Sequence, residues 1–321
     1  YILDMKKNNN IFVAGHKGLV GSAVINLLKK KGFKKIITVD RKKLDLRNYN
    51  KVYKFFRKKK IDYMVMAAAR AGGILANNTY QKDFFLENIE IQNSLLKLAL
   101  NKRIKRTIFL GSSCIYPKFS QNPIKEESLL TGKLEKTNQC YAIAKIAGIK
   151  LCEALYEDHN VDVVCMMPTN VYGINDNFDS FSGHVIPAMI SKFISAKRSK
   201  KKNMKLIGTG KPIREFINSK DLATAIFQVL KISKNKINKD FKKKLPMINV
   251  GSGESVTINK LSKIISQIVG YKGKIHFDTK FPDGTFKKNL DSKKIKKLGW
   301  KPKISLREGL LQVIRSRLDG N

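Results

Sequence analysis

The sequence has no long apolar run, and this absence excludes a membrane-spanning protein. No segment of the 321 residues approaches the roughly 18 to 20 consecutive apolar residues that a helix needs to cross a bilayer. Residues 1–10 are polar and lack the apolar stretch of a secretory signal. We therefore expect a soluble, cytoplasmic protein that has no membrane partner.

Cysteine is also scarce, and the spacing of the four cysteines excludes the common metal motifs. They form no C-x-x-C pair and no other ligand spacing, so we predict no metal site. Three of them, Cys140, Cys152 and Cys165, lie in helical or apolar contexts, where a buried free thiol is the usual role. Cys114 differs, because it follows a pair of serines.

Acidic residues are few: 25 Asp and Glu face 64 Lys and Arg, which gives a formal net charge of +39. Nucleic-acid binding is one hypothesis for such a charge. Against it, lysine greatly outnumbers arginine, and the basic residues are spread along the whole chain without interleaved aromatic residues. We predict a lysine-rich solvated surface and no nucleic-acid partner. Such a surface would attract a polyanionic cofactor or substrate.

Short apolar runs alternate with amphipathic stretches through the first half of the chain. This alternation is typical of parallel strands joined by helices. The sequence therefore predicts an α/β protein with a Rossmann-type, doubly wound parallel sheet. The expected strands are residues 11–14, 36–39, 63–66, 107–110, 161–166 and 247–250, and the expected helices of this part are residues 19–31, 48–58, 80–100 and 140–158.

The strand and helix pattern loosens after Pro168. Further helices are expected at residues 185–196, 221–232 and 258–269, and the basic run 234–244 is expected to be an exposed loop or a short helix. We expect two units, each made of two chain segments. They are a cofactor-binding unit of residues 5–171 plus about 216–250, and a smaller α/β substrate-binding unit of about 172–215 plus 251–321.

A glycine-rich loop lies between the first predicted strand and its helix, and it reads Gly15, His16, Lys17, Gly18, Leu19, Val20, Gly21. Glycines in this place let the backbone approach a pyrophosphate at the helix N-terminus. Asp40 ends the second strand, where an acidic residue usually binds the ribose of NAD. Arg41 and Lys17, however, would suit the 2′-phosphate of NADP. We favour NADP(H) as the cofactor.

Two motifs predict a site for carbonyl chemistry. Tyr141 and Lys145 are four residues apart and therefore share one face of a helix. A nearby ammonium group lowers the pKa of a tyrosine, which makes it a usable proton donor and acceptor beside a carbonyl. Ser112 or Ser113 follows the strand at 107–110 and could donate a hydrogen bond to the same carbonyl oxygen.

Together these residues resemble the extended short-chain dehydrogenase/reductase family, whose members act mainly on nucleotide sugars. Longer strings extend the resemblance from residue 11 to about 310 and are most similar to the branch that acts on a GDP-linked keto sugar. They are Ala-Gly-Gly-Ile-Leu-Ala-Asn-Asn-Thr-Tyr (71–80), Gly-Ser-Ser-Cys-Ile-Tyr-Pro (111–117), Tyr-Ala-Ile-Ala-Lys-Ile-Ala-Gly-Ile-Lys (141–150), Met-Pro-Thr-Asn (167–170), His-Val-Ile-Pro-Ala (184–188), Arg-Glu-Phe (214–216) and Pro-Asp-Gly (282–284).

The resemblance implies a bifunctional epimerase–reductase. GDP-4-keto-6-deoxy-D-mannose would be epimerised at carbons 3 and 5 and then reduced at carbon 4 by NADPH, which yields GDP-L-fucose. Cys114 would be the base and His184 the acid of the epimerisation, and a thiol and an imidazole suit proton transfer near neutral pH. Tyr141 would protonate the carbon-4 oxygen, Ser112 would hold it, and Lys145 would also bind the nicotinamide ribose.

The same resemblance assigns further contacts. Arg214 would bind the GDP phosphates, Lys192 would lie near the nucleotide sugar, and Asp283 would reach the ribose or base. Ile207 stands where some relatives carry tryptophan, so stacking on the guanine would be weaker or supplied elsewhere. Additional cofactor contacts would come from Leu110, Gly111, Ser113, Pro168, Asn170, Val171 and His184.

Members of this family usually pair through two helices from each subunit. The resemblance therefore implies a homodimer built on a four-helix bundle, with the helices at about 80–100 and 140–157 as candidates. An alternative function within the family is a UDP-sugar 4-epimerase that keeps NAD bound. Cys114 and His184 favour the epimerase–reductase over this alternative.

Overall fold

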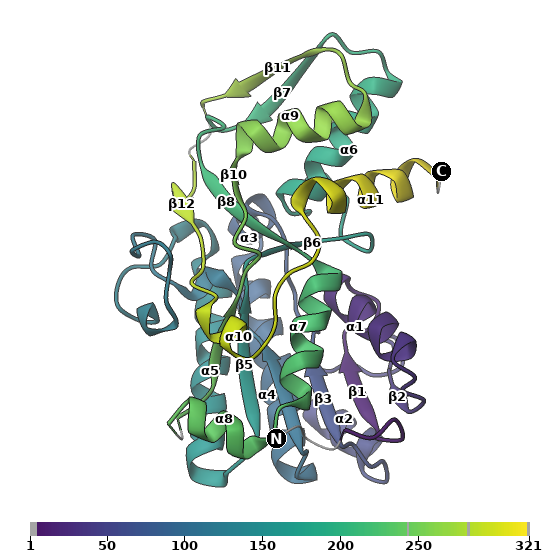
Figure 1. The fold of residues 1–321 in the computed structure, drawn as a ribbon, viewed down its shortest axis with the longest axis vertical. Coiled ribbons are helices and arrows are strands. Elements are labelled where there is room, and N and C mark those ends of the chain that lie inside the picture. Colours follow the sequence, from purple (N-terminus) through teal and green to yellow (C-terminus); the bar gives the residue numbers. More distant parts are fainter. Residues whose placement is uncertain (1–4, 243, 281–282, 320–321) are drawn as a thin grey trace.

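A six-stranded parallel sheet forms the centre of one half of the molecule (Figure 1). The structure, a computed structural model, describes residues 5–242, 244–280 and 283–319. The strand order is β2-β1-β3-β4-β5-β9, and all neighbours are parallel. This confirms the predicted α/β Rossmann-type sheet. The strands are β1 (Ile11–Ala14), β2 (Ile36–Ile37), β3 (Tyr63–Met66), β4 (Arg106–Leu110), β5 (Val163–Pro168) and β9 (Met247–Val250).

Helices cover both faces of this sheet, because each central strand is apolar on both sides. In β1, Phe12 faces the apolar cluster formed with α2 (Tyr49–Phe56), α4 (Gln81–Lys102) and α5 (Gln139–His159). Its neighbour Val13 faces the opposite cluster, formed with α1 (Leu19–Lys30) and α7 (Ser219–Lys231). The strand order reverses between β1 and β3, which is where ligands bind in open α/β sheets.

The other half of the molecule is built from shorter strands around a third apolar cluster. β8 (Ile213–Asn218) is the central strand of a small sheet and pairs with β6 (Asn170–Tyr172), β10 (Ser255–Thr257) and β12 (Lys287–Lys288). β7 (Asn203–Ile207) and β11 (Lys274–Asp278) form a separate parallel pair. The helices of this half are α6 (Val185–Arg198), α9 (Ile258–Val269) and α11 (Leu306–Asp319).

Several boundaries differ from those expected. The second strand ends at Ile37 instead of Val39, because the two-residue β2 pairs only along Ile11 and Phe12 of β1. The fifth strand covers 163–168 instead of 161–166. The basic run after Ser233 contains the short helix α8 (Lys234–Asp240). Short elements that were not predicted one by one are α3 (Ile74–Thr79), α10 (Lys293–Lys297), and the 3-10 helices η1 (Ser113–Ile115), η2 (Glu126–Ser128) and η3 (Lys136–Asn138).

We propose that the two halves are the two units expected from the sequence, divided at about 171, 215 and 250. The separate apolar cluster of the smaller half supports this division. One segment beyond 250 packs differently: Ile295, Leu298 and Trp300 belong to the cluster beneath α1 and α7. Residues 320 and 321, at the end of the smaller unit, lie outside the described residues.

Two further expectations concern membranes and metals. Among the described residues, none of the helices combines the length and apolarity that a bilayer crossing requires. Within the same ranges, no three His, Cys, Asp or Glu residues gather closely enough to hold a metal ion.

A buried ion pair fixes the amino end of β4 to its surroundings. Arg106 is fully buried, and its Nε and Nη2 donate to the carboxylate oxygens of Asp162 at 2.9 and 2.8 Å. The third nitrogen, Nη1, donates to the backbone carbonyls of Val229 and Ile232 at the end of α7. The guanidinium group therefore joins β4, the residue before β5 and α7 in one polar contact inside the core.

Replacing Arg106 with leucine should strongly destabilise the protein. The change leaves the Asp162 carboxylate and two carbonyls buried without their donor, which costs about 3–5 kcal/mol of unfolding free energy. Urea denaturation of Arg106→Leu and the wild type measures this difference. Lys150→Met is the control, because it removes an exposed ion pair with Glu153 and should change stability far less. Equal losses in the two variants would contradict the assignment.

Candidate active site

Several of the predicted site residues gather at the carboxyl edge of the parallel sheet. Gly15 follows β1, Ser112 follows β4, and Tyr141 lies in the first turn of α5. Since parallel strands end on the same edge, the loops after β1, β3 and β4 meet there. The sheet thus brings together segments that are far apart in the sequence.

The glycine-rich loop packs so closely that side chains at Gly15 and Gly21 would collide with neighbouring backbone. Gly15 has φ +78°, and a Cβ there would lie 2.7 Å from the backbone of Ala68 after β3. A Cβ on Gly21 would lie 2.2 Å from the carbonyl oxygen of Gly15. Gly18 is the N-cap of α1 without a side-chain hydrogen bond, and the first turn holds no acidic residue. The backbone N–H groups of Leu19 and its neighbours are therefore suited to bind an anion.

Two side chains of the glycine-rich loop lie beside the carboxylate of Asp40, three residues after β2. Lys17 Nζ lies 2.6 Å from Asp40 Oδ1, and His16 Nε2 lies 3.7 Å from the same oxygen. The hydrogen bond from Lys17 is the main reason that the pKa of Asp40 lies below its ordinary value. Arg41 is exposed and pairs loosely, at 3.5 Å, with Glu87 of α4. The loop thus presents neutralised or positive groups where the adenine ribose of a dinucleotide would lie.

Tyr141 is held between Ser112 and an aromatic ring. Phe84 of α4 packs against it edge-on, with ring centroids 6.3 Å apart. Burial raises the pKa of Tyr141, the charge of the Cys114 thiolate raises it further, and the hydrogen bond with Ser112 lowers it. The lowering expected from Lys145 is not found: Lys145 is not among the groups that shift the pKa of Tyr141, and the net shift is upward. A raised pKa keeps the phenol protonated, so Tyr141 is set to donate a proton.

Lys145 is buried one helical turn after Tyr141. Its Nζ donates to the carbonyl oxygen of Leu110 at 2.9 Å and lies 5.2 Å from the ring centroid of Phe109. Burial lowers the pKa of Lys145 to about 8. The ammonium group therefore contacts the last residue of β4. The loop that carries Gly111 and Ser112 begins directly after this residue.

Cys114 lies in the same loop and faces the same space. Its backbone N–H donates to Ser112 Oγ at 3.2 Å, and the Nδ2 of Asn138 lies 3.3 Å from its sulfur. A negative charge on the Cys114 sulfur would interact electrostatically with both Tyr141 and Arg214. Asn138 was not predicted as a site residue. Its place three residues before Tyr141, at the start of the same helix, is the one signal that could have indicated it.

His184 is the N-cap of α6 and is half-buried. Burial lowers the pKa of its ring, so that the protonated imidazole gives up its proton more readily. Its ring makes no hydrogen bond or ion pair with another described residue. The preceding loop packs closely against α3, because the N–H of Gly73 donates to Ser182 O at 2.9 Å and a Cβ on Gly73 would lie 2.3 Å from the oxygen of Gly183.

Two of the residues predicted to bind substrate, Arg214 and Asp283, interact electrostatically with each other. Arg214 of β8 is electrostatically coupled to Cys114 and to Asp283, and burial is the main cause that lowers its pKa. Asp283 accepts hydrogen bonds from the backbone N–H and the hydroxyl of Thr209 at 3.0 and 2.5 Å. Pro282, the first residue of the Pro-Asp-Gly string, lies outside the described residues.

The other predicted contacts are more dispersed. Lys192 is half-buried in α6, and Ile207 is 43% exposed at the end of β7. Asn170 donates its Nδ2 to Glu215 O at 2.9 Å, so part of its amide is already engaged. The remaining positions lie where β4 and β5 end and β6 begins: Leu110, Gly111, Ser113, Pro168 and Val171.

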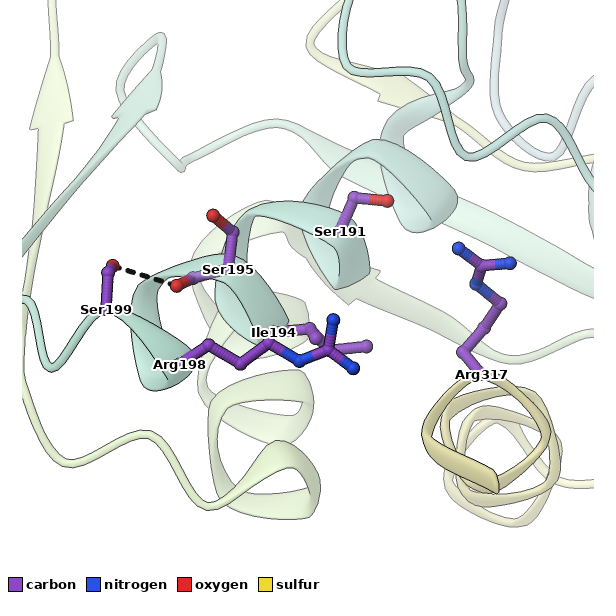
Figure 2. A pocket seen from close by; sticks show the side chains of 6 residues that line it. All are labelled: Ser191, Ile194, Ser195, Arg198, Ser199 and Arg317. Carbon is purple, nitrogen blue, oxygen red and sulfur yellow. Dashed lines mark hydrogen bonds between the residues drawn. The ribbon is translucent and has the colours of Figure 1, made fainter. Parts of the chain in front are cut away.

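A cavity of about 460 Å³ lies elsewhere, between α6 and α11 (Figure 2). The guanidinium groups of Arg198 and Arg317 lie on its two sides. The hydroxyls of Ser191 and Ser199 already donate to the carbonyls of Phe178 and Ser195. This cavity contains none of the predicted catalytic residues and is separate from the site at the sheet edge.

Comparison with known proteins identifies the family. A model of the NAD dependent epimerase/dehydratase family matches residues 11–251. GDP-L-fucose synthase 1 of Arabidopsis thaliana is 46% identical over 306 residues, which are 95% of this chain and 92% of that protein. GDP-L-fucose synthase of Escherichia coli is 42% identical and covers 94% of each chain.

A solved structure is also closely similar. It is a GDP-D-glycero-L-gluco-heptose synthase of Campylobacter jejuni, crystallised in the presence of NADPH. The two chains are 33% identical, superpose with a TM-score of 0.90, and cover 98% and 99% of each other. These matches confirm the resemblance found in the motifs. Because the family model covers most of the chain, and the relatives match nearly all of it, the chain belongs to the NAD dependent epimerase/dehydratase family.

Proposed function

We propose that this enzyme converts GDP-4-keto-6-deoxy-D-mannose to GDP-L-fucose, by epimerisation at carbons 3 and 5 followed by NADPH-dependent reduction at carbon 4. One observation carries the proposal: the Cys114 thiol lies in the same loop as Ser112 and interacts electrostatically with Tyr141. A reductase alone needs Ser112, Tyr141 and Lys145. A thiol beside them adds a group that can remove a proton next to the carbonyl.

The epimerisation would use Cys114 and His184. A thiolate at Cys114 would take the proton from a carbon next to the ketone, and the carbon–hydrogen electron pair would enter the enolate. His184, in its protonated form, would deliver a proton to the opposite face of that carbon. Its position at the start of α6, on the loop packed against α3, supports this role. Ser112 would stabilise the enolate oxygen by a hydrogen bond.

The reduction would use the same carbonyl oxygen. NADP(H) is the cofactor of this enzyme, and when bound it supplies the hydride. Tyr141, which burial keeps protonated, would give its proton to the carbon-4 oxygen. The glycines of the loop after β1 would hold the pyrophosphate, and Lys17 and Arg41 would meet the 2′-phosphate. The pairing of Asp40 with Lys17 supports NADP over NAD, because it reduces repulsion of that phosphate.

The GDP part of the substrate would extend towards the smaller half of the molecule. Arg214 would bind its phosphates, and Lys192, Ile207 and Asp283 would line the rest of its path. The coupling of Arg214 to both Cys114 and Asp283 supports this direction. The UDP-sugar 4-epimerase considered from the sequence is not favoured, because the relatives with the higher identities are named for GDP-sugar synthesis.

Three substitutions should separate the two stages of the reaction. Cys114→Ser and His184→Gln should slow the exchange of substrate hydrogens with deuterium oxide about 100-fold or more, because each removes a proton-transfer group. Tyr141→Phe should retain this exchange but lose NADPH oxidation by a similar factor. Mass spectrometry follows the exchange, and the absorbance of NADPH follows the reduction.

Matched controls are available for these substitutions. Cys140→Ser changes a half-buried thiol that contacts Gln81, and His276→Gln changes an exposed histidine on β11. Both should retain exchange and reduction. A wild-type enzyme that neither exchanges substrate hydrogens nor consumes NADPH with this substrate would contradict the proposed function.

The buried ammonium of Lys145 predicts the alkaline limb of the pH profile. Its pKa is about 8, so the charged form is complete at lower pH and is lost as the pH rises through that value. Loss of the charge should lower kcat/KM for reduction about tenfold per pH unit above this limb, because kcat/KM reports the free enzyme. Lys145→Arg keeps its charge and should remove the limb. A limb that stays near pH 8 in Lys145→Arg would show that another group causes it.

We also propose that the enzyme is a homodimer that pairs through α4 and α5. These helices pack against each other within one chain, and each leaves an apolar side chain exposed: Leu86 is 46% and Ile143 is 39% exposed. Two copies would bury both side chains in a four-helix bundle.

Sedimentation tests the proposed dimer. The wild type should have twice the mass of the 36.4 kDa chain. Leu86→Glu should yield the single chain at the same micromolar concentration, because the new charge would be buried between the helices. Phe119→Glu changes a side chain that is 87% exposed in a loop and should leave the mass unchanged. A wild type that sediments as one chain would contradict the dimer.

A further inference from the structure

The side chain of Asn138 lies against the sulfur of Cys114. Its Nδ2 is 3.3 Å from Sγ, and this is the one hydrogen bond of the side chain within the described residues. The amide oxygen Oδ1 is buried and has no partner there. Asn138 is the N-cap of α5, yet its side chain makes no capping hydrogen bond. The amide therefore does not serve the helix, and its contact is with the thiol.

We propose that Asn138 is a positioning residue for proton abstraction: its amide N–H groups hold the Cys114 sulfur toward the substrate and stabilise its thiolate form. This inference rests on the proposed epimerisation for its role in turnover. The contact itself is present in the free protein and can be tested without substrate.

The chemistry of the step explains why such a donor is needed. A neutral thiol carries a proton and cannot accept one from carbon, whereas the thiolate can. When the thiolate takes the proton, the S–H bond forms, the carbon–hydrogen bond breaks, and its electron pair moves into the enolate. A hydrogen bond to a charged acceptor is stronger than one to a neutral acceptor. Asn138 therefore favours the reactive form of Cys114.

Charged and titratable groups from other elements also face Cys114. Arg214 of β8 interacts favourably with a thiolate there, and Tyr141 of α5 interacts unfavourably as a phenolate. Glu135, which precedes η3, interacts in turn with Arg214. None of these three is changed by a substitution at Asn138. A change in the reactivity of the Cys114 thiol would therefore come from the loss of its contact with the Asn138 amide.

The backbone around Asn138 holds the amide in place. Its N–H donates to Glu135 O at 3.3 Å, and Glu135 Oε1 accepts from the N–H of Thr137 at 3.4 Å. Glu135 also pairs with Lys118 at 3.1 Å. In addition, α3 packs against η3 and η3 packs against α5. A fixed backbone allows the short side chain to act as a rigid donor.

Thiol alkylation of the free protein tests the contact. The rate of iodoacetamide modification of Cys114 is measured against pH by mass spectrometry of its peptide, with Cys114→Ser to identify the signal. Asn138→Asp keeps the shape but places a carboxylate beside the sulfur. Asn138→Leu removes the donor without adding charge. Both should move the alkylation profile to higher pH, by about one unit for leucine and further for aspartate, which is about tenfold slower alkylation at neutral pH.

The aspartate variant separates this role from a structural one. Aspartate is as good an N-cap residue as asparagine. If Asn138 served only to cap the helix, Asn138→Asp would therefore leave the alkylation profile of Cys114 unchanged. Asn48→Asp is the matched control, because Asn48 caps α2 through its side chain and is remote in sequence from the site. It should leave the alkylation profile unchanged. An unshifted profile in both Asn138 variants would overturn the inference.

Turnover connects the contact to the reaction. Asn138→Asp should slow deuterium exchange of the substrate about tenfold or more while NADPH binding, measured by fluorescence, stays unchanged. If the wild type exchanged no substrate hydrogens but the Asn138 variants still shifted the alkylation profile, the proposed function would be overturned and the amide–thiol contact would be supported. Normal exchange in Asn138→Asp would overturn the role of Asn138 in abstraction. The two failures are therefore distinguishable.

Discussion

The hydrogen bond from Lys145 to the carbonyl of Leu110 is the interaction on which the arrangement of the site depends. It joins the first turns of α5 to the last residue of β4, inside the core, where an unpaired ammonium would be very unfavourable. The bond fixes the rotation of α5 about its axis. That rotation directs Tyr141, one turn earlier, toward Ser112 and the loop after β4. A register shift of the helix by one residue would break the bond and turn the phenol away.

From this anchor the site extends along a single loop. Residues 111–115 carry the hydroxyl that holds Tyr141, the thiol, and the backbone turn of η1 that fixes their separation. Burial shifts the pKa values of Tyr141 and Lys145 in opposite directions: it raises the pKa of the phenol and lowers that of the ammonium. Both shifts favour the neutral forms. The free enzyme is therefore poised as a proton donor at Tyr141, and a negative charge that develops on a substrate oxygen would be stabilised by it.

The parallel sheet could be predicted, and candidate catalytic residues could be proposed at its edge, because their signals are local. The apolar strand at 11–14, the glycines after it and the four-residue spacing from Tyr141 to Lys145 are each visible within a few residues. The smaller half could not be predicted strand by strand. β7 and β11 pair across about 70 residues of intervening chain, and β12 has two residues, so their partners are set by tertiary packing. The balance of burial and charge at Tyr141 depends on neighbours from α4 and η1, which no spacing reveals.

Asn138 illustrates the same limit at the level of one side chain. Asparagine at a helix start has an ordinary explanation as a cap, and apart from its place three residues before Tyr141 the sequence contains no feature that distinguishes Asn138 from Asn48. The difference lies in what each side chain accepts or donates: Asn48 accepts from the N–H of Lys51, whereas Asn138 donates to a sulfur. That difference arises because η3 and η1 both pack against α5. The start of one helix therefore supplies the proton donor Tyr141 and, through Asn138, the environment of the thiol, so both stages of the proposed reaction depend on the same turn of α5.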